Sequence, residues 1–432
     1  MTSGSEARRR WHRTPALLIA IGAAVGLAGT GLALSRPDIV ALAAPLAVWA
    51  LFVLDAERDR PARDGAAASP IRVRAGPDAE DGRLTDEIVV DEDAEIAELH
   101  VVQSARRRSR VFVPGQAVLT ARSRSRHSGP VDSVRVRARG LSGDAALTGE
   151  VQDAVVQRRA VAPAPRELPE LPLPLRLTGL HGAHDGSRPG QGGDFRDIHP
   201  FAPGDELRRV DWRATARAAR RPGELFVRRT DTLSDASVVI AVDAADDLGE
   251  VVATWGSGDL ERSGRTSLDN AREAARALAT SAVAAGDRVA YHVLVQGGRS
   301  LRSGTGSRHL TRVVAAIAST GRSGDDSRYR RTPPVPHGSM IAMLSTFFDG
   351  AAAELALMWR AAGHRVLAVD TLPDLDGSRL SPEQRLALRL VVVERDDMFH
   401  DLAAAGVEIV RWDAEATSAL GVLARSRAGA GR

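Results

Sequence analysis

Two uncharged stretches near the N-terminus open the hydrophobic pattern of the chain. Residues 15–34 carry no charge over twenty positions, and residues 39–54 carry none over sixteen. A helix rises about 1.5 Å per residue, so the first stretch spans about 30 Å, the thickness of a bilayer core. Only residues 35–38 separate the two stretches. This spacing predicts a tight hairpin of two transmembrane helices in an N-terminal anchor that covers residues 1–56.

The charges that flank the first stretch predict its orientation. Arg8, Arg9, Arg10 and Arg13 precede it, and positively charged flanks stay in the cytoplasm. Two crossings return the chain to the same side, so we predict a multi-pass protein of the inner or plasma membrane, with its bulk in the cytoplasm. A cleaved signal peptide shares the basic start and the apolar run. The length of the first stretch and the second one directly after it favour the anchor.

Residues 70–160 alternate short β-type runs with turn residues. Val134, Val136 and Ala138 alternate with three arginines, which is the period-two pattern of a half-buried strand. We predict a small antiparallel β domain with a sandwich-like arrangement. A polar linker, residues 57–69, precedes it. A proline-rich connector, residues 161–178, follows it and cannot form a helix or a central strand.

The pattern changes again from residue 231 to the end of the chain at residue 432. Continuous apolar runs at 237–242, 289–295, 340–345, 366–370 and 407–412 alternate with segments of helical spacing. This alternation predicts an α/β domain with a parallel sheet and helices on both faces. Ligands of such sheets bind at the carboxyl ends of the strands. The segments to inspect are therefore residues 243–247, 297–306, 346–349 and 370–371.

Composition excludes several kinds of chemistry. The chain has no cysteine and no lysine, and its net charge is only +3, from 58 basic and 55 acidic residues. Disulfides, thiolate nucleophiles and iron–sulfur clusters are thereby excluded, as are Schiff-base lysines and the lysine of a phosphate-binding loop. No local motif shows a nucleophile, a base and an orienting group together.

Arginine is concentrated in the β domain, with twelve arginines against four acids between residues 100 and 160. Binding to nucleic acid or to anionic lipid is one interpretation. Phe112 is the only aromatic residue there, so a stacking platform for bases is lacking. Solvated outer strand faces that discourage edge pairing are the interpretation that we favour.

A segment dense in glycine, aspartate and arginine, residues 182–217, lies between the connector and the α/β domain. It has no simple periodicity and is hard to explain as core. Arginines pair with carboxylates through two hydrogen bonds, so an irregular loop can be held by such pairs. The candidate partners are Asp194, Asp197, Asp205 and Asp211 with Arg196, Arg208, Arg209 and Arg217. A preorganised surface for a partner and an internal ion-pair scaffold are equally compatible with this composition.

Several short motifs of this segment resemble the signature of the domain-of-unknown-function 58 family. They are Gly-Gln-Gly-Gly-Asp-Phe at 190–195, Pro-Gly-Asp at 203–205, Arg-Arg at 208–209, Val-Asp-Trp at 210–212 and Thr-Ala-Arg at 215–217. The resemblance implies two membrane helices, a small β domain, this signature segment at 179–230, and a Rossmann-type domain similar to von Willebrand factor A at 231–432. It also implies a neighbouring MoxR-type AAA+ ATPase, and other membrane proteins with von Willebrand factor A or transglutaminase-like domains.

Domains similar to von Willebrand factor A can hold Mg²⁺ through Asp-x-Ser-x-Ser after the first strand, with a threonine and an aspartate from later loops. Hard oxygen ligands suit such an ion. Here Asp243 is followed by Ala245 and Asp247, and Thr346 stands where the later aspartate is expected. Asp243, Asp247 and Thr305 are the residues that would bind the ion. Because the motif is degraded, we expect no resident metal or other cofactor.

Zinc is the other metal to consider. His181, His184 and His199 lie in a glycine-rich segment without a helix to align their rings, so we expect no zinc there.

The sequence therefore predicts a membrane-anchored protein-interaction scaffold rather than an enzyme. We expect it to act as an adaptor or partner of a MoxR-type ATPase in the assembly or maturation of envelope complexes. The expected contact residues are Asp205, Arg208, Arg209, Asp211, Trp212 and Arg217. The alternatives are a metal-dependent hydrolase that uses the Asp/His-rich segment and an arginine-driven binder of anionic lipid or nucleic acid. We expect no nucleic acid partner.

Overall fold

The structure, a computed structural model, describes most of the chain. The described residues are 11–58, 70–77, 82–104, 107–142, 144–174, 177, 182, 184–257, 260–295, 298–323 and 332–425. The chain divides into two compact units. The first comprises residues 1–126 and 131–159, and the second comprises residues 127–130 and 160–432.

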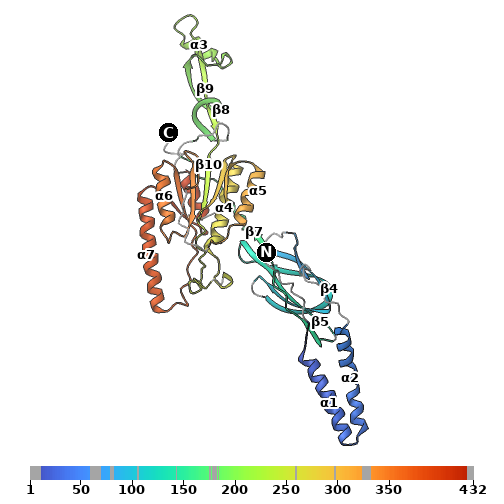
Figure 1. The fold of residues 1–432 in the computed structure, drawn as a ribbon. Helices are drawn as coiled ribbons and strands as arrows, with labels where there is room; N and C mark the ends of the chain where they lie inside the picture. Colours follow the sequence, from blue (N-terminus) through green and yellow to red (C-terminus); the bar gives the residue numbers. More distant parts are fainter. Residues whose placement is uncertain are drawn as a thin grey trace, which may run out of the picture. The chain divides into compact units, whose positions relative to one another are not determined.

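The first unit begins with a helical hairpin, α1 (Pro15–Ala33) and α2 (Pro37–Arg58), which Figure 1 shows as two adjacent helices. Both helices are long and apolar enough to cross a membrane by length and composition, which confirms the two predicted apolar helices. The turn between them is tight. A Cβ on Gly31 would lie 2.6 Å from Val40 Cγ2, so only glycine fits at this close approach.

The rest of the first unit is one antiparallel sheet of seven strands. Its strands are β1 (Trp11–Arg13), β2 (Ile71–Ala75), β3 (Arg83–Gln103), β4 (Arg107–Arg124), β5 (Gly129–Ser142), β6 (Leu147–Gly149) and β7 (Val155–Val161). The order is β1-β6-β5-β3-β2, with β4 also paired to β3 and β7 to β5. The sequence correctly predicted the antiparallel pairing.

The sheet does not form the predicted two-sheet sandwich. β3 is 21 residues long, and its pairing with β4 shifts between Asp91 and Ile96. A bulge of this kind bends a strand, so one long strand belongs to both halves of the sheet. The apolar faces of the halves then share one core, which includes Ile88, Leu99 and Val136.

The helical hairpin is joined directly to this sheet. β1 pairs with β6, and Leu147 of β6 is fully buried in a cluster with Leu17 of α1 and Val53 of α2. Thr14, just before α1, donates its backbone N–H to the carbonyl of Ala146 at 2.9 Å. The ends of both helices are thereby fixed to the edge of the sheet.

The second unit contains a six-stranded sheet in the order β12-β11-β10-β13-β14-β15. The strands are β10 (Ser237–Val242), β11 (Arg288–Val293), β12 (Ser300–Gly304), β13 (Met340–Ser345), β14 (Arg365–Asp370) and β15 (Glu408–Arg411). All neighbours pair in parallel except β12, which is antiparallel to β11. In sequence order this sheet reads 3-2-1-4-5-6, the order of doubly wound sheets.

Helices cover both faces of this sheet, as the alternation predicts. They are α4 (Ser267–Ala284), α5 (Ser307–Ala318), α6 (Ala351–Ala361), α7 (Pro382–Ala404) and α8 (Ala416–Arg425). In the central strand, Ile240 packs in a core with residues of α4, α5 and α8, whereas the next residue, Ala241, packs with residues of α6 and α7. Successive side chains of a strand point to opposite faces, so one apolar run supplies both cores.

The proline-rich connector packs against this second unit. Leu168 and Leu171 are buried in the core that faces α4 and α5. The carbonyl of Leu173 accepts a hydrogen bond from Arg365 Nη1 at 2.7 Å. Residues 162–174 therefore run in extended form along the α/β domain.

Candidate functional site

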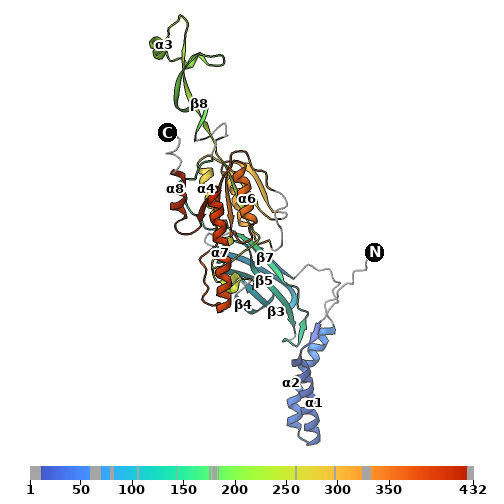
Figure 2. The ribbon, with the colours of Figure 1, turned by 90° about the vertical axis from the view of Figure 1, so that its left-hand side faces the viewer.

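The glycine-rich segment forms an antiparallel ribbon of two strands, β8 (His184–Pro200) and β9 (Phe226–Ser234). Pro200 pairs with Phe226 at one end of the ribbon, and His184 pairs with Ser234 at the other. Only two residues separate β9 from β10. Residues 201–225 form the opposite end, the ribbon tip, which carries the short helix α3 (Trp212–Ala218) (Figures 1 and 2).

Two aspartates shape the backbone of the ribbon tip. Asp205 accepts the N–H of Ala202 at 2.9 Å and so closes a turn, in which Gly204 has φ +100°. Asp211 caps the N-terminus of α3 by accepting the N–H groups of Arg213 at 3.0 Å and Ala214 at 2.9 Å. Both carboxylates satisfy local backbone donors, which is a structural role.

Further contacts attach α3 to the ribbon. The hydroxyl oxygen of Thr215 accepts the N–H of Phe226 at 2.9 Å. Val210, just before α3, bridges to Val227 of β9, and both side chains are buried. The backbone of the tip is therefore held from within, independently of its largest side chains.

Those large side chains point to solvent. Trp212 is 68% exposed and Leu207 is 67% exposed. Arg208 and Arg217 are also exposed. Burial of a large apolar side chain is favourable, and these two residues do not gain that free energy in the protein alone. Two exposed apolar side chains five positions apart therefore indicate an interaction surface.

A shallow groove of about 710 Å³ lies beside Trp212. Its lining residues are Arg208, Arg209, Val210, Asp211, Trp212, Arg213, Arg228 and Thr230. Four arginines against one aspartate give the groove a positive potential. Glu206 moderates it, because Arg208 hydrogen-bonds to Glu206 and Arg209 lies 3.6 Å from the same carboxylate. The hydrogen bond from Arg208 lowers the pKa of Glu206.

The ion pairs differ from those suggested by the sequence. Asp211 takes backbone donors, and Arg208 and Arg209 pair with Glu206 rather than with an aspartate. Asp205 does approach an arginine, Arg229 of β9, at 3.9 Å. An aspartate side chain is short, so it reaches the N–H groups of its own turn more readily than a distant guanidinium.

The expected metal residues do not come together. Asp243 follows the carboxyl end of β10, where it accepts the hydroxyl of Ser345 at 2.8 Å and the N–H of Ala245 at 3.1 Å. Thr305 follows β12, whose last residue, Gly304, pairs with Val289 near the start of β11. Because β12 runs antiparallel, Thr305 lies at the amino ends of the parallel strands, opposite to Asp243.

Asp247 binds the N-terminal turn of α4, where its carboxylate accepts the N–H of Leu268 at 3.2 Å. Burial raises its pKa, and a hydrogen bond from Thr266 opposes this only in part. Among the described residues, no group of three or more acidic or histidine side chains is arranged to hold a metal ion. The residues present therefore do not fit a magnesium site. His184 pairs with Asp287 and His199 contacts the carbonyl of Pro200, while His181 lies outside the described residues.

A buried arginine closes the carboxyl ends of β13 and β14, which sequence reasoning missed. Arg395 of α7 donates from Nε to the carbonyl of Thr346 at 2.6 Å and pairs through Nη2 with Asp370. Its guanidinium also lies 4.7 Å from the ring centroid of Phe399. This ion pair fills the carboxyl ends of β13 and β14, next to the point between β10 and β13 at which the strand order reverses and a doubly wound sheet usually binds its ligand.

We expect millimolar Mg²⁺ to leave the melting temperature of the full-length protein nearly unchanged. The oxygens of Asp243 already accept two hydrogen bonds, and Thr305 lies too far away to complete a site. An ion that binds only the folded state would raise the melting temperature in a saturable way. Thermal unfolding over a Mg²⁺ titration checks this. A saturable rise that Asp243→Asn removes would show that the strand end binds the ion.

Comparisons with known proteins agree with the resemblance of the ribbon tip. Residues 197–382 match a family model described as "Protein of unknown function DUF58". The uncharacterized protein Rv1480 of Mycobacterium tuberculosis and the uncharacterized protein Mb1516 of Mycobacterium bovis are each 27% identical over 289 residues, 61% of this chain and 83% of the relative. No solved structure is significantly similar. From the last residues of β8 to the start of α7, the chain is thus similar to a family whose description names no function.

Proposed function

We propose that the chain is a membrane-anchored scaffold that binds a protein partner through the ribbon tip. The observation that carries this proposal is that the residues that hold the backbone of the tip are different from its exposed large side chains. Asp205, Asp211 and Thr215 hold its backbone from within, whereas Trp212 and Leu207 remain in solvent beside an arginine-lined groove. Tryptophan and arginine contribute a disproportionate share of binding energy at protein interfaces.

The partner that we propose is a MoxR-type AAA+ ATPase, as the resemblance of the ribbon tip implies. The groove favours an acidic patch on that partner, because its four arginines have one aspartate and Glu206 as counter-charges. Complementary charge accelerates association and orients the partner. The scaffold would then recruit the ATPase to envelope complexes during their assembly or maturation.

We also propose that α1 and α2 cross the inner or plasma membrane, with both termini and the bulk of the chain in the cytoplasm. The arginine-rich flank before α1 and the length of both helices support this orientation. The strand order of the α/β domain, with one antiparallel edge strand, supports a fold similar to von Willebrand factor A.

Capture of the purified ATPase by the full-length protein in detergent tests the proposed function. We expect capture by the wild-type protein in the presence of a non-hydrolysable ATP analogue or of ADP. Arg208→Glu should reduce capture to background. Its melting temperature should stay close to that of the wild type, because an ion pair this exposed contributes little to stability.

The matched control is Arg385→Glu, which changes the same charge at an exposed position of α7. It should be captured like the wild type. Undiminished capture of both Arg208→Glu and Arg209→Glu would move the partner surface away from the ribbon tip.

A further inference from the structure

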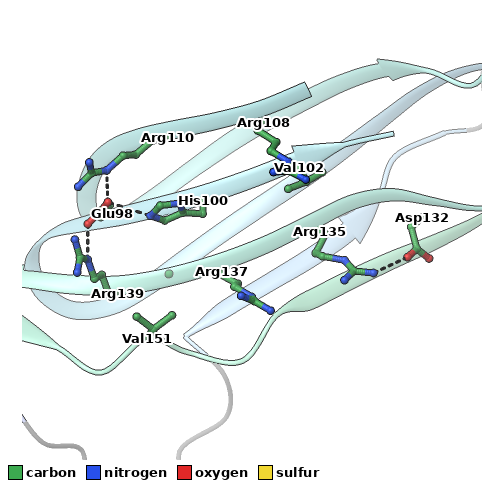
Figure 3. A pocket seen from close by; sticks show the side chains of 11 residues that line it. Glu98, His100, Val102, Arg108, Arg110, Asp132, Arg135, Arg137, Arg139 and Val151 are labelled. Carbon is green, nitrogen blue, oxygen red and sulfur yellow. Dashed lines mark hydrogen bonds and ion pairs between the residues drawn. The ribbon is translucent and has the colours of Figure 1, made fainter. Parts of the chain in front are cut away.

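The outer face of the first unit's sheet carries an ordered array of cations. Strand register places Arg110 and Arg137 on either side of His100, the central residue on β3. Two residues further along β3, Arg108 and Arg135 flank Val102 in the same way. The opposite faces of these strands supply the apolar core, so the four arginines share the outer face with His100 and Val102. Figure 3 shows them around one pocket.

A buried carboxylate organises one end of this array. Glu98 is 0% exposed, and it accepts hydrogen bonds from Arg110 of β4 and Arg139 of β5, with His100 at 3.1 Å. Burial by itself would raise the pKa of Glu98, but the hydrogen bonds from the two arginines lower it below its ordinary value. Glu98 thus stays ionised and fixes two guanidinium groups on opposite sides of β3 (Figure 3).

The array has more positive charge than its acids neutralise. Asp132 pairs with Arg135 at 3.1 Å. Within the part of the chain that the structure describes, the side chains of Arg108 and Arg137 form no hydrogen bond or ion pair, although their backbones pair with β3. Arg110 and Arg137, like Arg108 and Arg135, stand on the two strands that flank β3, so each row brings two positive charges together that an anion between them would neutralise.

The arginines surround a pocket of about 720 Å³. Two residues along a strand advance about 7 Å, so the Arg110–Arg137 row and the Arg108–Arg135 row are separated by that distance. A ligand with two anionic groups at this spacing would contact both rows. A merely solvated strand face needs neither a pocket nor a buried carboxylate that holds two arginines in place.

We propose that this pocket binds a phosphate-bearing anion, with Arg108 and Arg137 as the residues that contact it and Glu98 as a positioning residue. Arginine suits this ligand because its planar guanidinium makes paired hydrogen bonds to phosphate oxygens. The anion has two sources with the same chemistry, a soluble oligophosphate or the headgroup of an anionic phospholipid.

The lipid source rests on the proposed membrane anchor. β5 carries Arg137 and Arg139, and it continues to Leu141, which pairs with Thr148 beside the buried contact of β6 with α1 and α2. Arg139 is thus two residues, about 7 Å, from that pairing. The soluble source requires no membrane, so the pocket can be tested apart from the anchor and the ribbon tip.

Calorimetric titration of the full-length protein in a neutral detergent tests the pocket at about 150 mM salt, where loosely held surface charges are screened. The probes are tripolyphosphate, dihexanoyl phosphatidylglycerol and, as the uncharged-headgroup comparison, dihexanoyl phosphatidylcholine. Saturable binding of tripolyphosphate supports the soluble source. If the phosphatidylglycerol binds but tripolyphosphate and the phosphatidylcholine do not, the result supports the lipid source.

Variants assign the binding to the pocket. Arg137→Gln and Arg108→Gln should each weaken it about tenfold or more, because each removes a charged hydrogen-bond donor. Arg74→Gln, at an exposed position of β2 outside the pocket, should leave it unchanged. All three side chains are exposed, so the melting temperatures should agree. The proposal would be overturned if neither anionic probe bound the wild-type protein. It would also be overturned if Arg137→Gln and Arg108→Gln both bound the probe as tightly as the wild type.

Discussion

Replacing Arg395 by methionine is expected to lower the free energy of unfolding of the α/β domain by about 3–5 kcal/mol. Arg395 is 7% exposed, and its removal leaves Asp370, equally buried, without its cation. Among the described residues, the Asp370 carboxylate would keep one hydrogen-bond donor, the backbone N–H of Leu372 at 3.0 Å. The carbonyl of Thr346 would also lose its donor. A buried charge without its partner is more costly than the intact pair.

Urea unfolding followed by tryptophan fluorescence measures this effect, because Trp359 and Trp412 are buried in the two cores of the domain. Arg389→Met is the matched control, since Arg389 is exposed on the same helix. The double variant Arg395→Met with Asp370→Asn should regain part of the loss, because it removes the unpaired charge. A loss below about 1 kcal/mol for Arg395→Met would mean that water reaches Asp370 and solvates it.

The elements that the sequence predicted best are those in which composition alone decides the structure. Twenty uncharged residues can hardly form anything except an apolar helix, and α1 covers 19 of them. The strand at 340–345 is apolar at nearly every position because both of its faces are covered, and the structure places β13 there. Burial on both faces leaves a signal that does not depend on partners elsewhere in the chain.

Elements with little buried apolar surface were missed. β12 contains Ser300, Arg302 and Gly304, because an edge strand is exposed along one side and needs no apolar run. β8 is rich in glycine and aspartate, and its pairing with β9 shifts register four times. A two-stranded ribbon is held by backbone hydrogen bonds, for which side-chain periodicity gives no signal.

The candidate site was also predicted only in part. The sequence singled out Trp212 and Arg208 by their motif, but it assigned the wrong partners to Asp211 and Arg208 because pairing depends on the turn geometry. Arg395 carries no local signal either. It follows the apolar positions 391–393 within a helix, and its partner Asp370 lies 25 residues earlier in the chain.

Removing the indole of Trp212 is expected to weaken binding of the ATPase while leaving the protein folded. Trp212 is 68% exposed, so Trp212→Ala loses few intramolecular contacts, and its melting temperature should stay near that of the wild type. A tryptophan at the centre of an interface contributes about 2 kcal/mol or more, which corresponds to about a thirtyfold rise in Kd. Val422→Ala, which truncates an exposed apolar residue of α8, is the matched control.

The Kd of the purified ATPase for the wild-type protein and for Trp212→Ala, measured by interferometry in the same detergent, tests the role of the ribbon tip most directly. A binding surface at the tip predicts a rise in Kd of about thirtyfold for Trp212→Ala and no change for Val422→Ala. An equal Kd for Trp212→Ala and the wild type, or no binding by the wild type, would contradict it.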